Sequence, residues 1–230
     1  MRNNILWDNL PIYWQVCFEE AWDAYIHGSV PIGAVVVDNH GNVIGKGRNM
    51  VNEKHAPDGY ICWNKLAHAE LNCLLQISFH EHENIRSYSL YTTIEPCPLC
   101  FGALVMSNVR NLKYAARDRY AGGTVMSDSN GYIRSKPMKI LGYDPDLEVA
   151  SIALNVEYAI RNWPFADKVI AAWSMDCSPG VQIGLKWHGN GRLQTAKQKG
   201  ESISVIINEV DDEMKALASD FYVEKENKLL

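Results

Sequence analysis

The chain has 230 residues and a formal net charge of −5, with 47% hydrophobic and 21% charged residues. This composition excludes a disordered chain and a surface covered in phosphate-binding lysines. The length allows one large domain, or a domain of about 150 residues with an addition. No apolar run approaches the roughly 20 residues that span a bilayer, and residues 1–11 lack the apolar core of a secretory signal. We therefore expect no membrane association and a cytoplasmic location.

Hydrophobic periodicity predicts alternating helices and strands over the first 150 residues. The expected elements, in chain order, are a helix over 11–27, a β-hairpin from 33–38 and 42–48, a helix after His68, a strand over 87–93, a helix after Pro98, a strand over 111–116 and a fifth strand within 139–150. This alternation indicates a layered α/β domain.

The C-terminal third is less regular. Helices are predicted over 153–163 and 167–175, and a strongly amphipathic helix over about 204–221. Between them, residues 181–187 (VQIGLKW) alternate apolar and other residues, which predicts a half-buried strand.

Charge is distributed unevenly along the chain. Residues 110–140 carry seven basic residues against Asp118 and Asp128, whereas the last thirty residues carry eight acids against three lysines. The basic segment could meet an anionic ligand, and the alternative is two oppositely charged, solvated faces.

Two cysteines occur three positions apart in TIEPCPLC, residues 93–100. Alone, Cys97 and Cys100 fit a redox disulfide, a metal site or two small buried residues. A reducing compartment makes free thiols or metal ligands more probable than a disulfide.

LAHAEL, residues 66–71, distinguishes among these alternatives. His68 with Cys97 and Cys100 gives three ligands suited to tetrahedral zinc, and the fourth position would hold water, as in catalytic zinc sites. Glu70 supplies a carboxylate that can transfer protons between the water and a substrate. H-x-E followed by P-C-x-x-C is the signature of zinc nucleobase deaminases, and Pro96 completes it here.

At these residues the chain resembles the cytidine and deoxycytidylate deaminase superfamily, and within it the tRNA adenosine deaminase and guanine deaminase branch. The resemblance rests on residues 19–49, 66–74 and 90–118. It implies an α/β fold with three α/β/α layers around a five-stranded mixed sheet, zinc held by His68, Cys97 and Cys100, Glu70 as the catalytic proton shuttle, and a homodimer.

The resemblance also implies substrate-binding residues. These are Asn49 for the base, the backbone of Ala69 and the turn from Pro31 to Gly33 for the base pocket, and Asp118 for the sugar or flanking groups. Between Asn49 and His68 lies a longer segment than the branch usually has. Its aromatic residues either cap the base by stacking or pack on the surface, and we predict that Trp63 caps the base.

We therefore predict a deaminase domain over 1–150, an insertion of unknown role over 151–200, and a C-terminal helix over 201–230 that packs back on the first domain. In tRNA-acting members the terminal helix usually ends in basic residues, whereas here it ends YVEKENKLL. That difference favours hydrolytic deamination of a small-molecule substrate, a free nucleobase or nucleoside. The alternatives are deamination of the wobble adenosine of tRNA and a non-catalytic zinc-binding module, which would have no need of Glu70.

Overall fold

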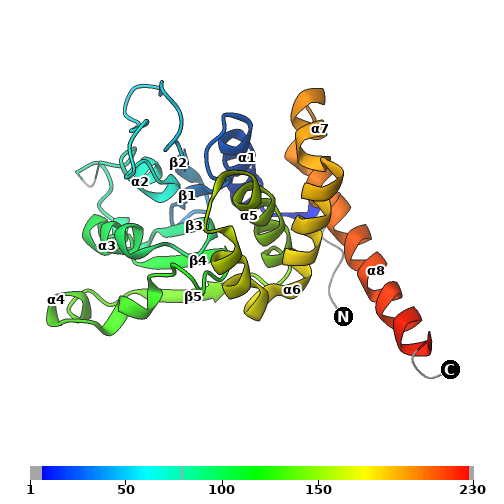
Figure 1. Ribbon diagram of the computed structural model, residues 1–230. Coiled ribbons are helices and arrows are strands. Elements are labelled where there is room, and N and C mark those ends of the chain that lie inside the picture. The colour runs from blue at the N-terminus through cyan, green and yellow to red at the C-terminus, as the bar shows by residue number, and fades with distance from the viewer. Residues whose placement is uncertain (1–6, 79, 228–230) are drawn as a thin grey trace.

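A computed structural model describes residues 7–78 and 80–227, with the side chains of 218–227 left out (Figure 1). Its centre is a five-stranded sheet in the order β2-β1-β3-β4-β5. The strands are β1 (Gly33–Val37), β2 (Val43–Arg48), β3 (Ser89–Ile94), β4 (Asn111–Ala116) and β5 (Lys139–Tyr143). Strand β1 pairs antiparallel with β2 and β3, whereas β3, β4 and β5 are parallel, so the sheet is mixed. The predicted fold class is confirmed.

The hairpin between β1 and β2 is built around Asp38. Its Oδ1 accepts hydrogen bonds from the backbone N–H groups of His40 (2.8 Å) and Asn42 (2.9 Å). Gly41 lies at φ +90°, where a side chain would be strained. These contacts fix the turn that the sequence places here.

Helices cover both faces of the sheet, as Figure 1 shows. They are α1 (Ile12–Ile26), α2 (Ala69–Leu74), α3 (Pro98–Ser107), α4 (Gly131–Arg134), α5 (Glu148–Asn162), α6 (Ala166–Asn190), α7 (Arg192–Lys199) and α8 (Ile203–Asn227), with short 3-10 turns at Trp7–Asn9, Ile85–Ser87 and Thr124–Asp128. Val35 and Val37 of β1 pack in one core with α1, α5, α6 and α8, and Ala34 and Val36 pack in the other with α2 and α3. Alternation of side chains along β1 therefore joins the two cores through one buried strand.

The strand predicted over 181–187 is wrong, because these residues lie within α6. Val181, Ile183 and Trp187 are buried, but Leu185 is exposed, so the buried face follows helical spacing rather than strict alternation. Gly184 permits the close approach of α5, since a Cβ there would lie 2.7 Å from Val156 Cβ. Only a tertiary contact distinguishes this helix from a strand.

The beginning of α8 packs into the first core. Ile203, Ile206 and Ile207 are buried there, and the Trp22 indole N–H donates to the Glu201 carbonyl (2.9 Å). The domain boundaries at 150 and 200 stay predictions. Within the described ranges, the helices are too short or too polar to cross a membrane.

Candidate active site

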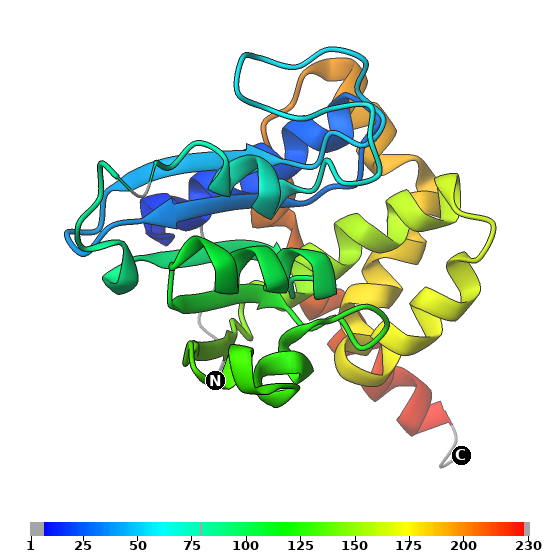
Figure 2. The same ribbon diagram turned by 90° about the vertical axis from the view of Figure 1, so that its left-hand side faces the viewer.

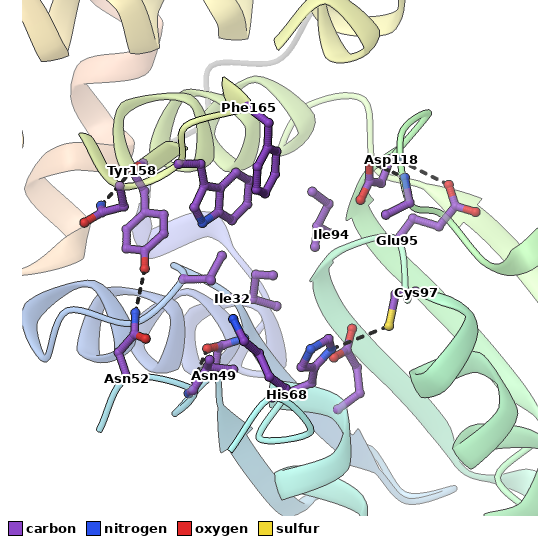
Figure 3. A pocket seen from close by; sticks show the side chains of 17 residues that line it. Ile32, Asn49, Asn52, His68, Ile94, Glu95, Cys97, Asp118, Tyr158 and Phe165 are labelled. Carbon is purple, nitrogen blue, oxygen red and sulfur yellow. Dashed lines mark hydrogen bonds between the residues drawn. The ribbon is translucent and has the colours of Figure 1, made fainter. Parts of the chain in front are cut away.

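Three potential metal ligands meet where α2 and α3 begin. His68 is the N-cap residue of α2, Cys97 is the N-cap residue of α3, and Cys100 lies in the first turn of α3. His68 Nδ1 lies 3.5 Å from Cys97 Sγ and 3.4 Å from Cys100 Sγ. The sequence places Pro98 at the start of α3, where its missing N–H costs nothing. The predicted triad is therefore assembled, and Figure 3 shows two of its members, His68 and Cys97.

The distances and chemistry of the triad fit zinc. Tetrahedral zinc with bonds of about 2.3 Å to sulfur and 2.0 Å to nitrogen places those ligand atoms roughly 3.5 Å apart. Both cysteines are free. A hydrogen bond from Cys100 lowers the pKa of Cys97 to about 4, while the pKa of Cys100 is raised by the same contact and by burial. The pair thus holds one proton, which a metal ion would displace on binding.

Glu70 lies in the first turn of α2, beside the triad. Its side chain is buried, and Thr92 Oγ1 on β3 donates to Glu70 Oε1 (3.2 Å). Burial raises the pKa of the Glu70 carboxyl, which suits a group that accepts and returns a proton near neutral pH.

A cavity of about 480 Å³ opens over the triad (Figure 3). His68, Glu70 and Cys97 line it together with residues from several other parts of the chain. The remaining lining residues are Val30, Ile32, Asn49, Val51, Asn52, Lys65, Ile94, Glu95, Asp118, Ala121, Tyr158, Asn162, Trp163 and Phe165. The volume and the mixed apolar and polar lining suit a molecule of nucleobase or nucleoside size.

Comparison with known proteins agrees with this geometry. Residues 9–116 match the family described as the cytidine and deoxycytidylate deaminase zinc-binding region. A tRNA-specific adenosine deaminase from Aquifex aeolicus (strain VF5) is 33% identical over 112 residues, which are 48% of this chain and 68% of that protein. The chain belongs to the cytidine and deoxycytidylate deaminase family.

One further relative and one solved structure can be compared with this deaminase-family chain. The tRNA-specific adenosine deaminase 2 of Xenopus tropicalis is 35% identical over 114 residues, 46% of this chain and 61% of that protein. A solved structure of a mutant protein in complex with 8-azaguanine has a TM-score of 0.51 at 23% identity, over 64% of this chain and 84% of that one. That likeness supports the fold alone.

Two of the predicted substrate residues line the cavity of the deaminase-family chain. Asn49 is almost fully buried, its Oδ1 accepts from Val51 N (3.2 Å), and its amide N–H₂ is a donor suited to a ring nitrogen or carbonyl. Asp118 Oδ1 accepts from the backbone N–H of Tyr120 (3.0 Å) and from Trp173 Nε1 (3.0 Å). The Asp118 carboxylate therefore organises its own loop as well as facing the cavity.

The other predicted substrate residues lie outside the lining. Pro31, Gly33 and Ala69 are neighbours of lining residues, and Gly33 is packed so closely on α1 that a Cβ would lie 2.0 Å from the Cys17 carbonyl oxygen. Trp63 is 62% exposed, with Lys54 Nζ 5.6 Å from its ring centroid. A base-capping role for Trp63 stays a prediction.

Sequence reasoning did not identify two groups of lining residues. Glu95 accepts hydrogen bonds from Asp118 N and Thr124 N (3.2 Å each) and so orders the loop after β4. The second group, from the end of α5 and the turn before α6, comprises Tyr158, Asn162, Trp163 and Phe165. The Trp163-Pro164 pair is a local signal for the end of α5, because the residue before a proline disfavours helical geometry.

Proposed function

We propose that this chain catalyses the hydrolytic removal of an amino group from a nucleobase. The observation that carries the proposal is the buried Glu70 carboxyl beside a three-ligand centre at a cavity of nucleoside size. His68, Cys97 and Cys100 would hold the zinc ion. Zinc in such a site lowers the pKa of a water to about 7, so that hydroxide is available at neutral pH.

The residues of this chain then divide the remaining tasks. Asn49 orients the base through its amide, and Ile32 and Ile94 exclude water from the sides of the ring. Glu70 takes one proton from the attacking water and delivers it to a ring nitrogen. It then takes the second proton from the added hydroxyl and delivers it to the amine, which leaves as ammonia while the ring carbon becomes a carbonyl. Thr92 holds the Glu70 carboxyl in place.

The first substrate that we propose is adenosine in tRNA. Both curated relatives described above are called tRNA-specific adenosine deaminases, and this supports the tRNA alternative better than the free base or nucleoside that the sequence favoured. The chain spans 61–68% of the length of these two relatives, so their substrate is carried over as a proposal.

A free nucleobase or nucleoside is the second candidate. It is favoured by the residues after 116, which lie outside the family match and supply an aromatic wall to the cavity. A cytoplasmic homodimer stays part of the proposal for either substrate.

Ammonia release from zinc-loaded protein tests the reaction. The substrates are an anticodon stem-loop containing a wobble adenosine, together with adenosine, guanosine, cytidine and their free bases. We expect release from at least one of them, and Glu70→Gln is expected to abolish it while zinc content is retained. Absence of release from the whole panel, or unchanged release by Glu70→Gln, would contradict the proposed reaction.

A further inference from the structure

The wall of the cavity opposite the triad comes from a part of the chain that the family match does not reach. The match ends at residue 116, whereas Tyr158, Trp163 and Phe165 belong to α5 and the turn that follows it. Figure 3 shows Tyr158 and Phe165 across the cavity from His68 and Cys97. The family match therefore does not determine what selectivity this wall provides.

Hydrogen bonds fix the α5 side of the wall. Asn52 Nδ2, from the segment after β2, donates to the Tyr158 hydroxyl (3.0 Å), which lies 3.3 Å from the Gly28 carbonyl. Figure 2 shows the segment after β2 (cyan) and the α5–α6 turn (yellow-green) at the same end of the sheet. The wall is thus joined to the loop that also carries Asn49.

Ion pairs and one hydrogen bond fix the α6 side. Trp173 Nε1 donates to Asp118 Oδ1 (3.0 Å) beside the cavity, and Arg119 makes two hydrogen bonds of 2.7 and 2.9 Å to the Asp176 carboxylate. Arg117 connects the two helices, because it pairs with the buried Glu148 (2.7 Å) at the start of α5 and donates to the Asp176 carbonyl oxygen (2.9 Å) of α6. With both sides attached, the α5–α6 turn is held in place over the cavity.

The aromatic rings in this turn have the geometry of a stacking platform. Trp163 and Phe165 are stacked, with ring centroids 5.5 Å apart and an interplanar angle of 17°. Tyr158 contacts Trp163 edge-on, at 5.8 Å and 82°. Phe165 is nonetheless 45% exposed, so the outer part of a supported aromatic stack faces solvent at the cavity.

We propose that Phe165, supported from behind by Trp163, is a specificity-determining substrate contact that stacks on a planar purine or pyrimidine ring. Aromatic faces bind such rings by stacking, and the cavity between this pair and the triad accepts a molecule of that size. The ring belongs either to a free nucleoside or to a nucleotide in an RNA loop. This inference rests on the proposed function, because it assigns the binding of the same substrate.

Binding measured without turnover tests the inference. In zinc-loaded Glu70→Gln protein, calorimetry gives the Kd of the best nucleoside substrate and of the anticodon stem-loop, before and after Phe165→Ala. We expect at least about a fivefold weaker Kd for the ligand whose ring stacks there. If the nucleoside binds more weakly to the Phe165→Ala protein, the ring that stacks is that of the target base. If only the RNA binds more weakly, the ring that stacks is that of a neighbouring base. Phe165→Tyr, which keeps a ring, is expected to recover most of the lost affinity.

Two controls separate the possible failures. Tyr132→Ala removes a similarly exposed aromatic side chain from α4, outside the cavity lining, and is expected to leave Kd unchanged. Trp163→Phe serves as a second variant that keeps the stack if Trp163→Ala unfolds. The inference is overturned if Phe165→Ala and Trp163→Ala are both folded and both bind each ligand with a Kd within twofold of the parent protein. Deamination by the wild type would be unaffected by that result. If the wild type deaminates nothing, the proposed function falls and this inference falls with it.

Discussion

Thr92 connects the central sheet with the proton shuttle. It lies on β3, is fully buried, and its hydroxyl donates to Glu70 Oε1 (3.2 Å). A hydrogen bond to a carboxylate is worth about 1.5–3 kcal/mol, and an unpaired buried carboxylate also moves more freely. We expect Thr92→Val to lower kcat by about tenfold or more while zinc content remains that of the wild type.

Thr92→Ser is the matched control, because it keeps the hydroxyl and removes only a methyl group. Its kcat is expected to lie close to the wild-type value. Equal losses in Thr92→Val and Thr92→Ser would attribute the effect to packing and contradict a positioning role for the hydroxyl. Metal analysis of both proteins shows whether the triad is disturbed.

The residues of the site differ in how readily the sequence reveals them. The spacing in the sequence predicts His68 with Glu70 and the two cysteines as site residues. Each of these two pairs lies at the start of one helix, and few other chemical roles fit residues of these types at this spacing. The resemblance predicts that the turn from Pro31 to Gly33 helps to form the base pocket, and Ile32 of this turn lines the cavity together with Val30. A resemblance identifies the correct turn, whereas the direction of each side chain depends on packing against α1.

At the scale of elements, the contact between α5 and α6 depends on glycine. A Cβ at Gly184 would lie 2.7 Å from the Ala153 carbonyl oxygen and from Val156 Cβ. We expect Gly184→Ala to lower the free energy of unfolding by about 1–3 kcal/mol, because backbone and a branched side chain must both shift. Chemical denaturation measures the change.

Gly189 provides the control in the same helix. It is exposed, and nothing lies within 4 Å of a Cβ placed there. Gly189→Ala is expected to raise the free energy of unfolding by up to about 1 kcal/mol, since alanine favours helices. Stabilisation by Gly184→Ala as well would show that α5 and α6 do not approach this closely.

The same elements show where prediction from sequence ends. The hairpin, the helices that present the triad and strands β3 and β4 have strong local signals, and the structure has them in place. The fifth strand is predicted only as lying somewhere within 139–150, and β5 occupies the first five of these residues. The alternation of Val181, Ile183, Leu185 and Trp187 predicts a strand, although residues 181–187 lie in α6, where Leu185 is exposed and the other three are buried. The contact of α6 with the Asp118 loop joins residues 55 positions apart, and no local pattern predicts it.

Asp176 makes the attachment of α6 sensitive to acid. The hydrogen bond from Arg119 lowers the pKa of the Asp176 carboxyl below its usual value. A carboxyl whose folded pKa is depressed stabilises the fold fully above its unfolded pKa of about 3.9, and the stabilisation is lost as pH falls through the folded pKa. We expect Asp176→Asn to lower Tm at pH 7, and the difference from wild type to narrow below about pH 4. A difference in Tm between the two proteins that stays the same at every pH would contradict a stabilising ion pair between Arg119 and Asp176.

For the whole molecule, the pairing of its charges bears on the choice of substrate. Of the seven basic residues in 110–140, four form ion pairs with acids, and these pairs are Lys113–Asp144, Arg117–Glu148, Arg119–Asp176 and Arg134–Asp128. The other three, Arg110, Lys136 and Lys139, form no ion pair with a described residue, so the basic segment is neutralised only in part. The side chains of the acidic C-terminal residues after 217 lie outside the described residues.

Salt dependence follows from this distribution of charge. Lys65 lines the cavity and can meet a phosphate, and one or two phosphate contacts give a fall in RNA affinity of about tenfold or less between 50 and 200 mM salt. We expect the apparent affinity for an anticodon stem-loop to change by no more than this, and that for adenosine to remain constant. A fall of about a hundredfold or more would require several unpaired cations at the RNA surface. It would contradict a binding mode in which Lys65 makes the main phosphate contact, and it would strengthen tRNA as the substrate.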